Sequence, residues 1–247
     1  MLLFDLSAIL AIVLDIEGTT TPIDFVFKTL FPFASQHVEE FLRENSSETE
    51  IKTLVAELRS TWSGAASAGA PVWIESTPQV KTASAAAYVR WLIARDSKIT
   101  PLKTLQGKIW EQGFRGGSLK GEVYPDVAPA FRRWREQGRR IAIFSSGSVL
   151  AQKLLFAHST AGDLSSYLEA YFDTTTGQKR EPDSYKRIAG ALQLPPRQVL
   201  FVSDVPAELD AARSAHLHTA HSLRPGVQQP ESLSHPVMRT FDELQFA

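Results

Sequence analysis

Three short apolar runs constrain the fold of this chain more than any other feature of its sequence. Residues 9–14, 141–144 and 199–202 are each continuously apolar, stop at a small or acidic residue and precede a segment with helical spacing. Such runs are typical of strands covered on both faces in a parallel sheet. The pattern predicts an α/β fold with a doubly wound, mostly parallel, Rossmann-like sheet. Shorter strands are predicted at 171–172 and around 219–220.

The segment between the first two runs follows a different period. Apolar residues between about 24 and 117 recur at helical spacing, and four helices could bury them as a small bundle. The 247 residues are enough for a large domain with a smaller partner. We therefore predict a core of residues 1–20 and 118–247 with an inserted α-helical cap domain of residues 21–117. The four apolar stripes are Leu30, Ala34, Val38 and Phe41; Ile51, Leu54, Val55 and Leu58; Tyr88, Val89 and Leu92; and Leu102, Leu105, Ile109 and Trp110.

Composition restricts the partners of the chain. With 26 basic and 27 acidic residues, the net charge of −1 gives no overall field for nucleic acid or an anionic membrane, and we expect neither as a partner. The apolar opening, residues 1–13, is too short to span a bilayer and lacks the basic start of a signal peptide. Because the chain has no cysteine, a cytoplasmic location is the simpler expectation. The basic cluster Arg132, Arg133, Arg135, Arg139 and Arg140 is interpreted as a solvated face.

The ends of the predicted strands carry side chains that suit phosphoryl transfer. Asp15 and Glu17 follow the first run, Ser145 and Ser146 the second, and Asp204 the third. Parallel strands end at one edge of a sheet, so we expect these residues on one rim. A carboxylate that attacks a phosphate dianion needs a bridging cation with oxygen ligands, and Mg²⁺ fits. Asp15 is interpreted as nucleophile and metal ligand, Glu17 as general acid and base, and Asp204 as a metal ligand.

Other polar residues are less specific. Lys179 lies in a loop before a helical segment and could neutralise charge at phosphorus, although a loop lysine by itself is usually solvated. Glu208 is equally consistent with an acid beside the site and with an ordinary first-turn residue. His216, His218 and His221 are interpreted as a scattered surface trio rather than a metal site. An isolated Asp-x-Glu most often caps a turn, so the combination of motifs carries the prediction.

These segments, in this order, resemble the four motifs of the haloacid dehalogenase superfamily of phosphohydrolases. The first motif there is usually Asp-x-Asp, whereas Asp15-Ile16-Glu17 is the departure found in the acireductone-forming enolase-phosphatases. Longer strings extend the similarity to that family over most of the chain. They are residues 14–23, 105–110, 145–156, 171–174 and 224–226.

The resemblance implies a bifunctional enzyme of methionine salvage. It would enolise 2,3-diketo-5-methylthiopentyl-1-phosphate and then remove its phosphate through an aspartyl-phosphate, giving the acireductone 1,2-dihydroxy-3-keto-5-methylthiopentene. One Mg²⁺ per chain would be bound by the side chains of Asp15 and Asp204 and by the main-chain carbonyl of Glu17. Ser145 and Ser146, with Lys179, would bind the phosphate. The helical insertion would close over the site, and the protein would be a monomer.

Two questions stay open at this level. The enolising base is not identified, and Glu17, Lys28 and Lys108 are all candidates. The main alternative keeps the fold and makes the chain a capped magnesium-dependent phosphatase for another small phosphate ester. A phospho-accepting receiver is disfavoured, because receivers place their acidic metal pair before the phosphorylated Asp, whereas Asp204 comes last here.

Overall fold

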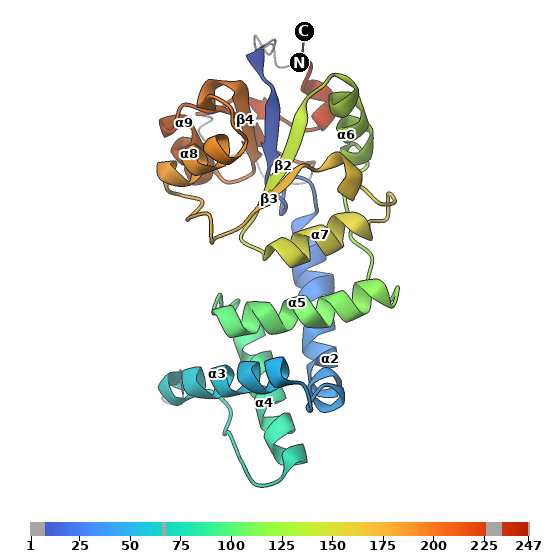
Figure 1. Ribbon diagram of the computed structural model, residues 1–247, viewed down its shortest axis with the longest axis vertical. Coiled ribbons are helices and arrows are strands. Elements are labelled where there is room, and N and C mark those ends of the chain that lie inside the picture. Colours follow the sequence, from blue (N-terminus) through green and yellow to red (C-terminus); the bar gives the residue numbers. More distant parts are fainter. Residues whose placement is uncertain (1–7, 66–67, 226–233, 247) are drawn as a thin grey trace. The chain divides into compact units, whose positions relative to one another are not determined.

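The chain divides into two compact units, described here separately (Figure 1). The core unit comprises Met1–Ile23 and Lys120–Ala247, and the helical unit comprises Asp24–Leu119. The computed structural model describes residues 8–65, 68–225 and 234–246, so the opening residues 1–7 and Gly226 lie outside the described residues. Within these ranges, no helix is long and apolar enough to cross a membrane.

The core unit is built on a six-stranded sheet in which every neighbouring pair is parallel. Its strand order is β3-β2-β1-β4-β5-β6, and Leu14 at the end of β1 pairs with Ile143 and Val202 on either side. The predicted fold class is confirmed, including both short strands, whereas β6 was not predicted. The strands are β1 (Ala11–Leu14), β2 (Arg140–Phe144), β3 (Ala170–Phe172), β4 (Val199–Ser203), β5 (His218–Ser222) and β6 (Val237–Met238).

Helices cover both faces of this sheet (Figure 1). On one face, Val13 packs in a cluster with Tyr185 and Leu209, and alternate residues of β1 point to the other face. There, Phe131 packs against Phe156. Burial on both faces explains why β1 reads as an unbroken apolar run. The helices are α6 (Val127–Glu136) and α7 (Val149–Ala157) on one side, and α8 (Pro182–Ala191) and α9 (Pro206–Ser214) on the other, with short 3₁₀ turns at Ser165–Tyr167, Pro196–Gln198 and Phe241–Glu243.

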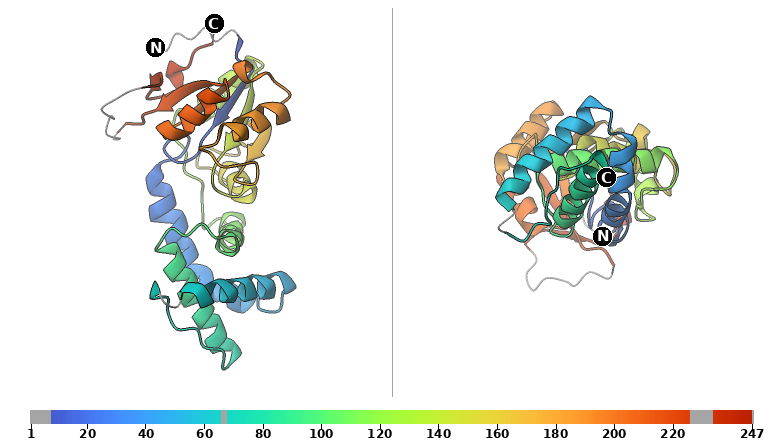
Figure 2. Two further views of the ribbon diagram at one scale, coloured as in Figure 1. Left: turned by 90° about the vertical axis from the view of Figure 1, so that its left-hand side faces the viewer. Right: turned by 90° about the horizontal axis from the view of Figure 1, so that it is seen from below.

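The helical unit contains four long helices, and each carries one of the four apolar stripes. A short helix and a π-helical turn lead into them, and α2 lies beside α4 (Figure 2). Trp110 of α5 links this helix to the end of the π-helical turn, because its indole N–H donates to the carbonyl of Leu30 at 2.8 Å. The helices are α1 (Ile23–Phe25), the π-helical turn η2 (Val26–Leu30), α2 (Phe31–Glu44), α3 (Thr49–Ala65), α4 (Pro78–Ile93) and α5 (Thr100–Arg115).

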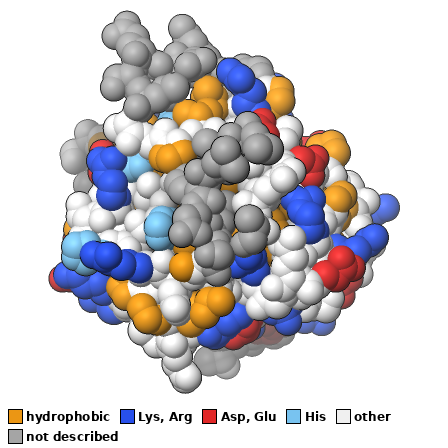
Figure 3. All heavy atoms as spheres, turned by 90° about the horizontal axis from the view of Figure 1, so that it is seen from above, with side chains coloured by type: hydrophobic (Ala, Val, Ile, Leu, Met, Phe, Trp, Pro, Cys, Tyr) orange, Lys and Arg blue, Asp and Glu red, His pale blue; other side chains and the backbone are white. Residues whose placement is uncertain are grey.

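The interpretation of the arginine cluster as a solvated face was wrong for Arg139. Its side chain is buried, donates to the carbonyl of Ile9 and lies 3.9 Å from the ring centroid of Phe246. Arg140 is bonded to Glu169, with Nε 2.8 Å from Oε1. Figure 3 shows the core unit from above, where basic, acidic and apolar side chains are interspersed. Arg133 and Arg135 also lie beside carboxylates, those of Asp242 and Glu169, so this run of like charges does not form one basic surface.

Candidate active site

Asp15 lies at the centre of the sheet edge where the strands end. It directly follows β1, and its backbone N–H donates to the carbonyl of Val202 at 2.9 Å, which continues the pairing with β4 by one residue. Its carboxylate is buried, with the residue 2% exposed. Because β1 lies between β2 and β4, the loops after both neighbouring strands can supply groups to Asp15.

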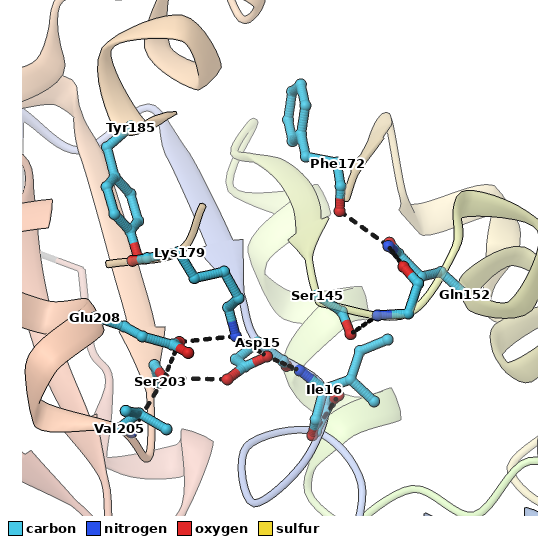
Figure 4. Close-up of polar contacts among 12 residues, drawn as sticks. Asp15, Ile16, Ser145, Gln152, Phe172, Lys179, Tyr185, Ser203, Val205 and Glu208 are labelled. Atoms are coloured by element: carbon cyan, nitrogen blue, oxygen red, sulfur yellow. Dashed lines mark hydrogen bonds and ion pairs between the residues drawn. The ribbon is translucent and has the colours of Figure 1, made fainter. Parts of the chain in front are cut away.

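The carboxylate of Asp15 belongs to a buried ionic network (Figure 4). The ammonium of Lys179 lies 2.7 Å from Asp15 Oδ1 and 2.7 Å from Glu208 Oε2. The hydroxyl of Ser203 lies 3.1 Å from Asp15 Oδ2 and 2.9 Å from Glu208 Oε2. This hydroxyl has a single proton, so it donates to one carboxylate at a time. It also accepts from the backbone N–H of Val205 at 3.1 Å, which fixes its position.

Burial and charge act in opposite directions within this network. Burial alone lowers the pKa of Lys179, but the carboxylates of Asp15 and Glu208 outweigh it and raise that pKa overall. The pKa of Glu208 is raised to about 7, first by burial and then by Asp15, against the effect of Lys179. Tyr185 steadies the lysine by donating from its hydroxyl to the Lys179 carbonyl at 2.6 Å. Lys179 is thus a fixed cation beside Asp15.

A tight loop after Asp15 brings Asp204 to the same place. Gly18 has φ +66°, and a Cβ added there would lie only 2.2 Å from Asp204 Oδ2. Glycine is therefore needed both for the backbone conformation and for the close approach. Glu17 lies in this loop, which is closed by the Thr20 hydroxyl donating to the Asp15 carbonyl at 3.1 Å. Acid groups from distant parts of the sequence thus meet at one rim.

The loop after β2 forms the other side of this edge. The Ser145 backbone N–H donates to the Phe172 carbonyl at 3.2 Å, and its buried hydroxyl accepts from the Gly147 N–H at 3.1 Å. Ser146 lies between these two residues, just before α7. The side-chain amide of Gln152 donates to the carbonyls of Gly147 and Phe172, at 2.8 and 2.9 Å. The loop is thus held from β3 and from within α7.

Sequence reasoning missed several members of this site and misplaced one. Ser203 was not singled out, although it directly precedes Asp204 at a strand end, and Gln152 gave no signal of its own. Glu208, whose role was open, contacts Lys179 and Ser203. The interpretation of His221 as a surface residue was wrong: it is 4% exposed, and its Nε2 lies 3.1 Å from the Asp204 carbonyl.

The donors at this edge suit a hard divalent cation. In the described ranges no group of three or more His, Cys, Asp or Glu is placed to hold a metal ion, and Asp15 and Asp204 are the carboxylates that the strand ends bring to this rim. No described lysine or arginine forms an ion pair with Asp204. Its pKa is raised to about 7, first by burial and then by Asp15. Lys179 is paired with Asp15 and Glu208, so among the described residues Asp204 has no ion-pair partner of its own.

The chain is similar to known proteins over most of its length. The family model of haloacid dehalogenase-like hydrolases matches residues 9–216. The chain is 51% identical to enolase-phosphatase E1 of Synechococcus elongatus, over 96% of this chain and 98% of that protein. It is 47% identical to enolase-phosphatase E1 of Drosophila virilis, over 97% and 96%. The crystal structure of the unknown transcript 4 protein of Saccharomyces cerevisiae is similar with a TM-score of 0.77 and 33% identity, covering 96% of this chain and 100% of that one.

Proposed function

This chain belongs to the haloacid dehalogenase-like hydrolases and, within them, to the enolase-phosphatases, and from that membership we propose how it converts 2,3-diketo-5-methylthiopentyl-1-phosphate to the acireductone and phosphate. The observation that carries the proposal is the buried carboxylate of Asp15, which lies 2.7 Å from a fixed ammonium at the end of a central strand. Such a carboxylate is oriented for attack and shielded from water.

Asp15 is the nucleophile in the proposed phosphatase step. One of its oxygens bonds to phosphorus while the bond from phosphorus to the substrate's C1 oxygen breaks, which gives an aspartyl-phosphate. Glu17 donates a proton to the leaving oxygen and then takes one from the water that attacks the phosphorus. Phosphate leaves, and the Asp15 carboxylate is regenerated.

The remaining residues bind and orient the phosphate. Ser145 and Ser146 offer hydroxyls and backbone N–H groups before α7, where a helix N-terminus favours an anion. Lys179 keeps its proton beside Asp15 and Glu208, and its charge offsets the negative charge that builds up on the phosphoryl oxygens. Ser203 restrains the Asp15 carboxylate through a contact with Oδ2.

Enolase-phosphatases are generally magnesium dependent, and the donor set fits this requirement. One Mg²⁺ would be held by the side chains of Asp15 and Asp204 and by the main-chain carbonyl of Glu17. When bound, it supplies the positive charge that lets a phosphate dianion approach a carboxylate. The monomeric state, the cytoplasmic location and the role of the helical unit as a closing cap are parts of the same proposal, supported by the family resemblance.

For enolisation, the structure favours Glu17 among the three candidate bases. Lys28 lies 2.6 Å from Asp24, and Lys108 lies 2.7 Å from Glu50. Each of these lysines is thus occupied by a carboxylate of its own unit, whereas Glu17 lies in the loop directly after Asp15. A carboxylate at position 17 can take a proton from C1 of the substrate, which leaves an enolate at the C2 oxygen. The same proton then passes to the leaving C1 oxygen, and the proton that Glu17 later takes from the attacking water passes to the C2 oxygen.

The test is to incubate the purified protein with Mg²⁺ and the diketo phosphate. An ultraviolet-absorbing enol should appear together with inorganic phosphate, EDTA should stop both, and added MgCl₂ should restore them. Sugar phosphates serve as the comparison. Phosphate release from them alone, with none from the diketo phosphate, would support the rival phosphatase for another small ester and overturn this assignment.

A further inference from the structure

Three side chains at or just after the end of β5 contact backbone carbonyls in the loop that contains Glu17 and at Asp204. The hydroxyl of Ser222 donates to the Gly18 carbonyl at 3.0 Å. The guanidinium of Arg224 donates to the Thr19 carbonyl from Nε at 2.9 Å and from a terminal nitrogen at 2.5 Å. His221 Nε2 lies 3.1 Å from the Asp204 carbonyl, and because a carbonyl can only accept, this nitrogen carries the proton.

Arg224 is itself fixed from several directions. Its side chain is 1% exposed, and it forms an ion pair of 2.6 Å with Asp126. Its guanidinium lies 4.3 Å from the ring centroid of Tyr124 and 4.4 Å from that of Phe241. Asp126 in turn accepts from the Phe241 backbone N–H at 2.6 Å. A planar guanidinium that contacts two rings and is paired with a carboxylate has little freedom to move, so the carbonyl that it binds is held in place.

The buried charge of Arg224 is used to bind a backbone carbonyl of the loop after Asp15. A buried guanidinium is costly unless its donors are satisfied, and the carbonyls of a buried turn need protein donors in place of water; Thr19 and Thr20 are both 0% exposed. Here two donors of Arg224 bind the Thr19 carbonyl, and the next carbonyl, that of Thr20, accepts from the Tyr124 N–H at 3.0 Å. The turn that contains Glu17 is therefore set by contacts from the end of β5 and from the segment before α6.

We infer that His221, Ser222 and Arg224 form a backbone clamp that positions the metal-binding groups of the site. The clamp fixes the peptide planes next to Glu17 and the backbone of Asp204, and so aims the Glu17 carbonyl and the Asp204 carboxylate at one point. None of the three side chains takes part in the chemistry. The inference depends on the proposed function for two things only, which are the identity of the metal ion as Mg²⁺ and the reaction that the site catalyses.

The main test substitutes Arg224 with Lys and with Met, beside a matched control. Lysine keeps the charge but cannot bind one carbonyl with two donors. Arg139→Lys is the control, because Arg139 is another buried arginine that donates to a backbone carbonyl and stacks on a ring, but at Ile9, before the opposite end of β1. Each variant is titrated with Mg²⁺ alone by calorimetry, and its kcat and KM are measured as a function of Mg²⁺ concentration.

The clamp predicts a specific loss of metal affinity. In Arg224→Lys the Mg²⁺ dissociation constant should rise by about 10-fold, and in Arg224→Met by up to about 100-fold, the range typical of residues that hold metal ligands in place. The fall in kcat at low Mg²⁺ should be partly recovered at high Mg²⁺. Arg139→Lys should leave the dissociation constant within about twofold of wild type, even if its melting temperature falls.

Ser222→Ala and His221→Gln keep the inference testable if the Arg224 variants do not fold. Each variant removes or replaces a single contact with a backbone carbonyl, and each should raise the Mg²⁺ dissociation constant. The rise should be smaller in His221→Gln, because the glutamine amide can still donate a hydrogen bond. Variants that fold and bind Mg²⁺ as the wild type does would overturn the clamp. The calorimetric measurement needs no substrate, so it decides this question even if the wild type proves inactive on the diketo phosphate.

Discussion

The two units of the molecule bury very different side chains. In the described part of the helical unit, Ser84 and Gln106 are the buried polar residues beside an apolar interior. Among the described residues of the core unit, in contrast, many polar groups are buried, including six Asp, Glu, His or Arg residues. The six are Asp15, Arg139, Glu208, His221, Arg224 and His235.

Burial of charged groups therefore distinguishes the core unit, which contains the candidate active site, from the helical unit, whose interior is mainly apolar. The helical unit keeps its ion pairs near the surface, where each contributes little to stability, so its fold depends on apolar contacts. The core unit removes charges from water, which costs free energy that the partners of each charge only partly return. Most of these charges lie at or beside the edge that contains Asp15. We therefore expect substitutions of polar residues to have their largest effects there.

The largest effect is expected for Asp15→Asn. An amide is no nucleophile at phosphorus, so phosphate release should fall by on the order of 10⁴-fold or more, while the far-ultraviolet circular dichroism stays that of the wild type. Asp242→Asn is the control, because its side chain is 64% exposed and pairs with Arg133. A variant at position 15 that retained most of its turnover would rule out Asp15 as the nucleophile.

Two lysines with equal ion-pair distances provide the next test. Lys179 and Lys108 each lie 2.7 Å from a carboxylate, but the side chain of Lys179 is 10% exposed and its partners are Asp15 and Glu208, whereas Glu50 beside Lys108 is 61% exposed. Lys179→Met leaves two buried carboxylates without their cation. It should lower the free energy of unfolding at pH 8 by about 3–5 kcal/mol and remove activity.

Lys108→Met should change the free energy of unfolding by less than about 1 kcal/mol. Urea titrations of both variants, measured without metal, give the comparison. Equal losses of unfolding free energy would mean that burial does not distinguish the two ion pairs.

Lys108→Met also tests the identity of the enolising base. Loss of enol formation in this variant, with phosphate release from other esters intact, would make Lys108 the enolising base in place of Glu17.

Local patterns in the sequence were sufficient to predict the sheet and the acids at its edge. A strand buried on both faces must be apolar throughout, and a residue that ends it lies at the rim, so Asp15 and Asp204 could be placed without a structure. β6 could not be predicted, because Val237–Met238 is too short to show a period. It forms only because β5 offers it a parallel edge.

The tertiary partners of the acids were beyond the reach of the same patterns. Ser203 bonds to Asp15, which lies 188 positions away, and Arg224 bonds to Thr19 across 205 positions. Nothing in the neighbourhood of either residue specifies its partner. His221 and Arg139 have polar side chains that are usually exposed, and only the fold shows that each is buried with a backbone carbonyl to bind.

Two buried serines test whether a polar group serves the site or the fold. Ser84 accepts from the Ile74 backbone N–H at 3.1 Å in the helical unit, and Ser203 bonds to the acid network. Ser84→Ala should cost about 1 kcal/mol of unfolding free energy and leave kcat/KM unchanged. Ser203→Ala should cost a similar amount and also lower kcat by about 10-fold or more, since Asp15 loses a restraint. Equal kcat in the two variants would remove Ser203 from the site.

The smallest expected effect concerns pH and the buried His235. Its Nε2 lies 3.1 Å from Asp210, and its Nδ1 lies 2.9 Å from the Thr219 hydroxyl. Burial lowers the pKa of His235, and Arg213 and His221 add to this effect, against the hydrogen bond to Asp210. Because the folded state resists protonation, this histidine contributes stability above the unfolded pKa of about 6.5, and that stability is lost as the pH falls further.

Urea titrations at pH 7 and pH 5 measure this contribution. The loss of unfolding free energy between the two values should be smaller in His235→Asn than in the wild type, because the variant has no proton to bind at this position. Asp210→Asn should act in the opposite direction and enlarge the loss, since it removes the carboxylate charge that helps to raise the pKa of His235. If all three proteins lost the same free energy, the acid sensitivity of the core unit would have to come from the carboxylates at the site edge, and His235 would be a packing residue like those of the helical unit.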